Sequence, residues 1–217
     1  MIPAPKAILF DWDNTLIDGW AAIQAGLNAA FAAFGKPAWS REQVLANVRK
    51  SLRDSFPEHF GDEWERARDI FYEAVRATHL EVIRPLPDSI AMLDAVAHLP
   101  LGVVSNKQGP LLRAEAAHLG WNVRFGSLIG AGDAMADKPS GMPLHLALKS
   151  MGLMAGPSIW YVGDTSIDMQ AARAAGCTAV LLGDAAHDGG VAAVSPDIDF
   201  ADGVALARWV GALDKQG

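Results

Sequence analysis

Two aspartates, Asp11 and Asp13, stand on either side of Trp12 in the segment at residues 8–18, which reads ILFDWDNTLID. An Asp/Asn-rich turn is one explanation for the pair, because both residue types favour turns. A site that uses both carboxylates is the other explanation. The remaining polar clusters of the chain bear on the choice between them.

Polar residues also follow three later apolar runs, at residues 101–104, 127–131 and 158–162. In chain order these residues are Ser105, Asn106, Lys107, Lys138, Asp164 and Asp168. With the first two aspartates they provide carboxylates, a hydroxyl, an amide and ammonium groups. Four turn-like signals, each placed after an apolar run, favour one common site over unrelated turns.

These groups suit phosphoryl transfer. A carboxylate with an ordinary pKa of about 4 is ionised at pH 7 and can act as a nucleophile. Its approach to a phosphate requires a cation, and Mg²⁺ binds oxygen ligands such as those of Asp11 and Asp164. A lysine and a hydroxyl can hold the other phosphate oxygens. Asp13 is close enough in sequence to give the leaving group its proton.

The elements that must position these residues alternate between strands and helices. Strands are predicted at 7–10, 101–104, 127–131, 158–162 and 178–182, with helices at 109–119, 142–152 and 166–175. Such alternation is typical of an α/β fold, a parallel sheet covered on both faces. Ligands of these sheets bind at the carboxyl ends of the strands, where the polar residues stand.

Residues 18–84 interrupt this alternation. Their apolar residues recur at helical spacing, as in Ile23, Leu27 and Phe31, and the segment shows no convincing strand. We therefore expect two domains, a catalytic core made of residues 1–17 and 85–217, and a helical cap domain made of residues 18–84.

The polar clusters resemble, in the same order, the four motifs of the haloacid dehalogenase-like superfamily. They are DWDNT at 11–15, Ser105, Lys138 and GDTSID at 163–168, and the match spans nearly the whole chain. VVSNK at 103–107 and KPSGMPLHLAL at 138–148 are similar to the phosphoglycolate phosphatase-like group. The resemblance implies a Rossmann-like core with an inserted α-helical cap. It also implies an Mg²⁺-dependent phosphatase that hydrolyses a small phosphate monoester.

The resemblance also implies catalytic and metal-binding roles. Asp11 would be the nucleophile that forms an aspartyl-phosphate, and Asp13 the general acid and base. Mg²⁺ would be bound by Asp11, by the backbone carbonyl of Asp13 and by Asp164. The second acid favours a phosphatase or phosphomutase over a dehalogenase, which lacks it in this superfamily.

Other positions would hold the phosphate or support the site. Ser105, Asn106 and Lys138 are the expected phosphate-binding residues. Thr15 and Asp168 are expected behind the metal ligands, with Asp168 acting directly or through a water. Because Thr165 stands three residues before it, Asp168 is also suited to capping a helix.

Two residues of the first motif depart from the family pattern. Asn14 stands where the family usually has glycine, and asparagine tolerates left-handed backbone angles better than most residues. Trp12 stands where a small aliphatic residue is usual. Its ring either narrows the site and alters the substrate or packs behind the loop.

Specificity is expected from the cap. Arg49, Lys50 and Arg53 cluster near a predicted cap turn. One hypothesis is a solvated helix face, and the other is a cationic patch that meets an anionic substrate. Together with Trp12, these are the candidate specificity residues.

Composition limits the partners. Hydrophobic residues make up 51% of the 217 residues, and the net charge is −7, which disfavours nucleic acid. The single cysteine excludes an internal disulfide, and no apolar run is long enough for a membrane span. We expect a cytoplasmic monomer or homodimer whose partner is a small phosphorylated metabolite.

Two alternatives remain open at this point. A phosphomutase of the same fold would pass the phosphate to a sugar instead of water. A non-enzymatic phospho-acceptor domain would also combine a parallel sheet, acids and a lysine. Asp13 and the helical insert count against the acceptor, which needs neither.

Overall fold

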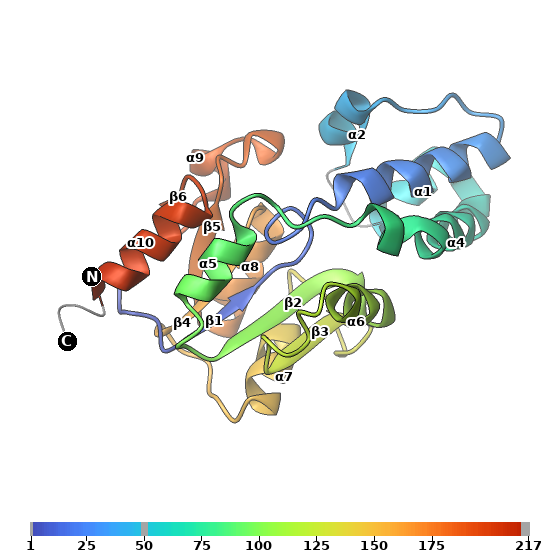
Figure 1. Cartoon of the computed structure of the whole chain (residues 1–217). Helices are drawn as coiled ribbons and strands as arrows, with labels where there is room; N and C mark the ends of the chain where they lie inside the picture. Colours follow the sequence, from blue (N-terminus) through green and yellow to red (C-terminus); the bar gives the residue numbers. More distant parts are fainter. Residues whose placement is uncertain (1, 49–51, 214–217) are drawn as a thin grey trace. The chain divides into compact units, whose positions relative to one another are not determined.

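A computed structural model describes residues 2–48 and 52–213 of the chain, which divides into two compact units (Figure 1). One unit, the sheet unit, joins residues 1–17 to residues 85–217. The other, the helical unit, consists of residues 18–84. The described part of the helical unit contains helices and no strand.

Six strands form one sheet, all of whose neighbours are parallel. They are β1 (Ala7–Phe10), β2 (Leu101–Gln108), β3 (Ser127–Ala131), β4 (Ile159–Gly163), β5 (Thr178–Leu182) and β6 (Ile198–Phe200). The strand order is β3-β2-β1-β4-β5-β6. Strands β2 and β3 are added on one side of β1, and β4, β5 and β6 are added on the other, so the switch point of the sheet lies between the neighbours β1 and β4. Ligands of doubly wound sheets bind at this switch point, outside the carboxyl ends of the strands.

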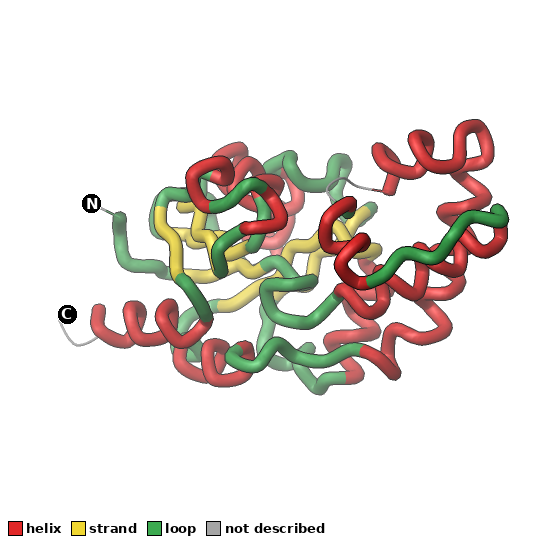
Figure 2. The backbone as a smooth tube through the Cα atoms, turned by 90° about the horizontal axis from the view of Figure 1, so that it is seen from above, coloured by secondary structure: helices red, strands yellow, loops and turns green. Residues whose placement is uncertain are grey.

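Helices cover both faces of the sheet (Figures 1 and 2). The helices of this unit are α5 (Ser89–Ala95), α6 (Gly109–His118), α7 (Met142–Ser150), α8 (Ser166–Ala175), α9 (Val191–Val194) and α10 (Gly203–Leu213). The helices α5, α6 and α10 lie on one face, and α7 and α8 lie on the other. Right-handed crossovers require this division, because the chain first builds the sheet in one direction and then in the other. The predicted α/β fold is confirmed.

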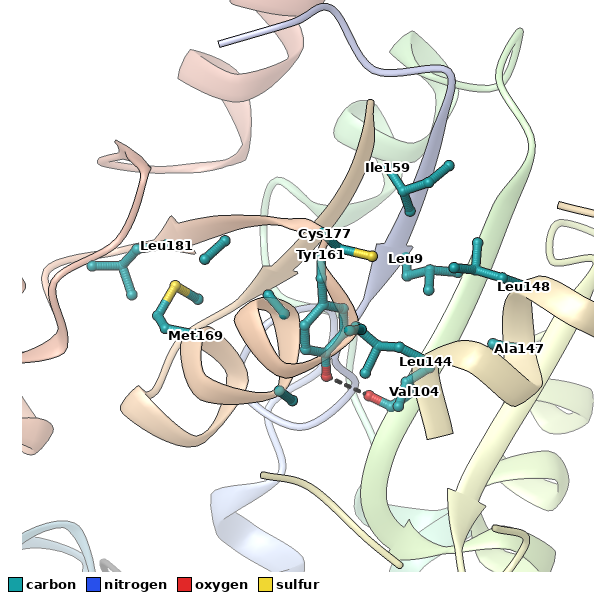
Figure 3. Packing of buried hydrophobic residues seen from close by; sticks show 14 of the residues in the cluster. Leu9, Val104, Leu144, Ala147, Leu148, Ile159, Tyr161, Met169, Cys177 and Leu181 are labelled. Carbon is teal, nitrogen blue, oxygen red and sulfur yellow. Dashed lines mark hydrogen bonds between the residues drawn. The ribbon is translucent and has the colours of Figure 1, made fainter. Parts of the chain in front are cut away.

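The core beneath α7 and α8 is apolar (Figure 3). Leu9 and Tyr161 point into it from β1 and β4, and Leu144 and Met169 meet them from the helices. The Tyr161 hydroxyl donates a hydrogen bond of 2.7 Å to the Val104 carbonyl, which satisfies a polar group that burial would otherwise penalise. On the opposite face, aromatic rings of β4, β6 and α10 pack together.

The helical unit contains α1 (Trp20–Ala33), α2 (Arg41–Asn47), α3 (Leu52–Phe60), a short 3₁₀ turn η1 (Gly61–Glu63) and α4 (Trp64–Val82). Its core is rich in aromatic rings, and Phe31 and Phe60 stack with centroids 5.6 Å apart. The helices α1 and α4 approach closely at Gly26. A Cβ atom there would lie 2.6 Å from the Phe71 ring, so no other residue fits without a shift.

Three features differ from the sequence expectation. Strand β2 continues to Gln108 instead of ending at Val104, with an irregular register against β3 between those residues. Strand β6 and helix α9 were not expected, because each is shorter than the runs that periodicity can identify.

None of the described helices is long and apolar enough to cross a membrane.

Candidate active site

Asp11 follows β1 directly and lies at the switch point of the sheet. Its backbone N–H donates to the Val162 carbonyl of the neighbouring strand β4, at 2.8 Å. The loop then turns sharply at Asn14, whose φ of 64° is left-handed. The Asn14 N–H donates to the Ile17 carbonyl at 2.7 Å. Asparagine thus occupies a position that favours glycine, and the tight turn keeps the loop at the carboxyl edge of the sheet.

Lys138 joins two of the predicted acids. Its Nζ atom lies 2.7 Å from Asp11 Oδ1 and 2.7 Å from Asp168 Oδ1. Burial alone would lower the pKa of Lys138, but the two carboxylates raise that pKa well above its ordinary value. The lysine is therefore a fixed cation, held between the end of β1 and the first turn of α8.

Asp168 also caps α8, as the sequence suggested. Its Oδ2 atom accepts hydrogen bonds from the Thr165 hydroxyl at 2.6 Å and from the Thr165 N–H at 3.1 Å. Tyr161 lies behind it, with its hydroxyl oxygen 3.1 Å from Asp168 Oδ1. Burial would raise the pKa of Asp168, but Lys138 and the two Thr165 donors hold that pKa below its ordinary value. Asp168 is accordingly an ionised acid within a dense hydrogen-bond network.

The position of Asp168 depends on Gly163, the last residue of β4. A Cβ atom at Gly163 would lie 2.4 Å from the Cβ of Asp168. Carbon atoms do not approach so closely, so a side chain at this position would displace Asp168. The glycine is required by close packing, because the first turn of α8 folds back onto the strand end.

Three buried carboxylates gather at this edge. Oxygens of Asp11, Asp164 and Asp168 lie within 4.8 Å of one another, which is close enough to hold one metal ion. Thr15 donates to Asp164 at 3.3 Å and helps to orient it. Burial raises the pKa of Asp11 to about 6, against the effect of Lys138. Burial, followed by the charges of Asp168 and Asp11, raises the pKa of Asp164 well above its ordinary value.

Ser105 and Asn106 lie on β2 beside the same edge. Ser105 is buried, and its hydroxyl accepts a hydrogen bond from the Lys107 N–H at 3.2 Å. The Asn106 amide makes two 3.0 Å hydrogen bonds to the backbone N–H and carbonyl of Lys138. Asn106 therefore fixes the loop that carries Lys138, and its expected contact with phosphate stays a prediction.

Asp13 belongs to a second network. Lys107 Nζ lies 2.8 Å from Asp13 Oδ1 and 2.7 Å from Glu115 Oε2. The same Glu115 oxygen accepts a 2.7 Å hydrogen bond from the indole N–H of Trp12. Burial raises the pKa of Asp13, and Lys107 opposes this shift. Burial would lower the pKa of Lys107, but Asp13 and Glu115 raise it.

The Trp12 ring packs behind the loop and is 0% exposed. It meets Trp121 edge-on with centroids 5.8 Å apart, and Phe125 at 6.5 Å. Of the two alternatives for this residue, the structure therefore favours packing over narrowing of the site. A fully buried ring does not reach a substrate.

His187 approaches the site from the loop after β5. Its Nε2 atom lies 3.5 Å from Asp164 Oδ2. The neighbouring Asp188 accepts a 2.6 Å hydrogen bond from the Ser166 N–H at the start of α8. The loop is thus attached to the helix that carries Asp168.

The structure brings the core candidates together within the sheet unit. Two of the predicted cap residues, Arg49 and Lys50, lie outside the described residues. Arg53 lies in α3, and only its backbone is described. The role of these three residues in specificity stays a prediction.

Sequence reasoning assigned no role to Lys107, Glu115 or Tyr161. One signal was available, since Glu115 shares the buried face of α6 with Leu111 and Leu112. A glutamate on an apolar helix face is unusual unless it has a partner. One partner, Lys107, is only 8 positions away, but the other, Trp12, is 103 positions away and meets Glu115 through packing between distant segments.

A doubly wound sheet with a buried cluster of acids and a lysine at its switch point is typical of α/β enzymes. The sequence model of one family, described as haloacid dehalogenase-like hydrolase, matches residues 8–182. The chain belongs to this family and is a hydrolase. The predicted family and enzyme class are confirmed.

Relatives of similar length support this assignment. A phosphoglycolate phosphatase from Xylella fastidiosa is 36% identical over 79% of this chain and 77% of its own length. A phosphoglycolate phosphatase from Photorhabdus laumondii is 31% identical over 82% of this chain and 80% of its own. A haloacid dehalogenase-like hydrolase of Streptococcus pneumoniae has the same fold, with a TM-score of 0.85 at 21% identity over 94% of this chain and 98% of that chain. The predicted likeness to phosphoglycolate phosphatases is confirmed.

Proposed function

We propose that this hydrolase is an Mg²⁺-dependent phosphatase that cleaves a small, phosphoglycolate-like phosphate monoester. The observation that carries the proposal is the Asp11 carboxylate, placed 2.7 Å from the Lys138 ammonium and beside Asp164 and Asp168. An acid that attacks a phosphate requires nearby cations, because both reacting groups carry negative charge. The relatives named phosphoglycolate phosphatase support the substrate class.

The residues present fit a divalent metal. Three buried carboxylates face one lysine in this group, so negative charge exceeds positive charge in a desolvated place. Burial is the largest cause of the raised pKa values of Asp11 and Asp164, and the neighbouring carboxylates add to it. Oxygen ligands at such spacing suit Mg²⁺. Asp11, Asp164 and the backbone carbonyl of Asp13 would hold the ion, with Asp168 in contact directly or through a water. The ion would neutralise the phosphate and keep Asp11 ionised.

The reaction proceeds in two steps. An Asp11 carboxylate oxygen attacks phosphorus, the bond to the leaving oxygen breaks, and the Asp13 proton moves to that oxygen to give an alcohol. Water then attacks the aspartyl-phosphate and gives a proton to Asp13, and the Asp11 carboxylate is released with inorganic phosphate. Lys138 and Ser105 hold the phosphate oxygens throughout.

The two units divide the work. Residues 1–17 and 85–217 form the catalytic core, and residues 18–84 form the cap that selects the substrate. Arg49, Lys50 and Arg53 are the proposed cationic contacts for a small phosphorylated metabolite. The buried ring of Trp12 acts on the site only through the residues that it contacts.

A panel of phosphate esters, assayed for released phosphate with and without Mg²⁺, tests the proposal. Wild type should release phosphate only with the metal, and Asp11→Asn should lose at least about 10³-fold in rate while keeping its circular dichroism spectrum. Asp202→Asn is the matched control, because Asp202 is exposed on the loop before α10. Unchanged activity in Asp11→Asn would overturn the proposal. Sugar-phosphate isomerisation without phosphate release would indicate the mutase instead.

A further inference from the structure

We propose that Lys107 is a positioning residue for the acid Asp13, and that Glu115 and Trp12 fix Lys107 in place. The inference rests on the proposed function, because it assigns a task to residues beside the proposed general acid. These four residues come from three segments of the sheet unit, the loop after β1, the end of β2 and the buried face of α6.

Lys107 makes two charge-assisted hydrogen bonds through one ammonium group, at 2.8 Å to Asp13 and at 2.7 Å to Glu115. Its side chain is 11% exposed. A lysine on a flexible stem does not fix its partner unless its own position is fixed. Glu115 provides the second point of attachment, so the ammonium lies on a defined line between two carboxylates.

Glu115 is held in turn by the protein interior. Its side chain is 1% exposed, a position that an unpaired carboxylate rarely takes. The Trp12 indole N–H donates to the same oxygen that Lys107 contacts. Trp12 cannot rotate away, because its ring packs edge-on against Trp121 and Phe125. Thus the ring between the two catalytic acids anchors a chain of contacts that ends at Asp13.

This chain of contacts determines what Asp13 can do. Lys107 contacts Oδ1 of Asp13, which leaves Oδ2 to give the proton to the leaving oxygen. A leaving alkoxide is a strong base and needs this proton, whereas an activated phenolate leaves without it. Lys107 should therefore matter for alkyl esters and matter little for activated aryl esters.

Lys107 has an alternative task, which is to bind the substrate directly. A lysine that binds phosphate would affect all esters equally. A lysine that binds a substrate carboxylate would affect only esters that carry one. The test therefore uses alkyl and aryl phosphate monoesters without a carboxylate, so that leaving-group basicity is the main variable.

The measured quantity is kcat/KM, which includes the step that expels the leaving group and excludes hydrolysis of the aspartyl-phosphate. For Lys107→Met we expect kcat/KM to fall about 10²-fold on alkyl esters and less than about 5-fold on p-nitrophenyl phosphate. The plot of log kcat/KM against leaving-group pKa should become steeper. Trp12→Phe keeps every charge and most of the ring but removes the indole N–H, and it should steepen the same plot to a smaller extent.

Trp209→Phe is the matched control, because it makes the same ring change in the aromatic cluster of β4, β6 and α10, away from the segments that carry Trp12, Lys107 and Glu115. It should leave the slope unchanged. Equal slopes in Lys107→Met and wild type, or a loss confined to carboxylate-bearing esters, would overturn the inference and leave the proposed function intact. A wild type without Asp11-dependent phosphate release would overturn both. If Lys107→Met fails to fold, the slope of Trp12→Phe decides the matter.

Discussion

The two units of this chain bury different kinds of side chain. Within the described ranges, the sheet unit buries charged residues, namely Asp11, Glu115, Lys138, Asp164 and Asp168. The described interior of the helical unit is apolar apart from His79. Buried charges are costly unless they are paired, so a protein that retains them has a reason beyond stability. The sheet unit therefore places buried charged groups where they can react or bind, whereas the helical unit is held together by apolar packing.

The largest expected effect is at the buried cation. Lys138→Met leaves Asp11 and Asp168 close together without their ammonium, and it should lower the free energy of unfolding by about 3–5 kcal/mol. Urea denaturation at pH 8 measures this change. Lys149→Met on the exposed surface of α7 is the control and should shift stability by less than about 0.5 kcal/mol. Similar small effects for both variants would contradict the contrast between the units.

A bound metal ion should offset the unfavourable free energy of burying the acids. Magnesium at about 100 times its dissociation constant should stabilise the wild type by about 2.7 kcal/mol, measured as a shift in Tm. Asp164→Asn should lose most of this gain. Because burial raises the folded-state pKa of Asp164 above its unfolded value, the ionised acid opposes folding at pH 8. The metal-free variant should therefore be more stable than metal-free wild type.

Asp62→Asn, at an exposed turn of the helical unit, is the control for that experiment. It should keep the full magnesium-dependent shift. A magnesium shift that survives in Asp164→Asn would place the ion elsewhere.

In the helical unit, shape should matter more than charge. Gly26→Ala places a Cβ atom 2.6 Å from the Phe71 ring, and overpacking of this kind typically costs about 1–3 kcal/mol. Gly211→Ala in α10 is the control, because a Cβ atom there meets nothing within 4 Å. It should be neutral or slightly stabilising, since alanine favours helices. Equal effects of the two changes in chemical denaturation would argue against close packing of α1 on α4.

The smallest effect is expected at an exposed ion pair of the helical unit. Arg41 lies 3.1 Å from Asp18, and both side chains are substantially exposed. Arg41→Met should change stability by no more than about 1 kcal/mol, and high salt should abolish the difference. A loss as large as that of Lys138→Met would remove the distinction between buried and exposed pairs.

Much of the sheet unit could be predicted because its local signals agree. The run AILF at β1 is buried on both sides, and its polar continuation in Asp11 falls at a strand end. Parallel topology then places the carboxyl ends of all strands at the same edge of the sheet. The proximity of Asp11, Lys138 and Asp164 could therefore be predicted from residue types and their places after the strands. Asn14 could be anticipated in the same way, since its left-handed φ follows from backbone sterics.

What escaped prediction depends on contacts between distant segments. Lys107 and Asp13 are 94 positions apart, and Trp12 and Glu115 are 103 apart. No periodicity encodes which buried carboxylate will meet which indole. The short edge strand β6 has only three residues, too few for alternation to be recognised. The contact of Gly26 with Phe71 required the pairing of α1 with α4, which sequence spacing does not specify.

Gly163 constrains how this sequence can change. A side chain there would collide with Asp168, and Asp168 in turn holds Lys138. Positions 163, 168 and 138 therefore depend on one another. A substitution of Gly163 displaces Asp168 and so removes a contact of Lys138. A mutational library or a redesigned chain that varies Gly163 is expected to yield inactive members even where every catalytic side chain is retained. Deep mutational scanning should therefore rank this glycine with the acids, although it carries no functional group.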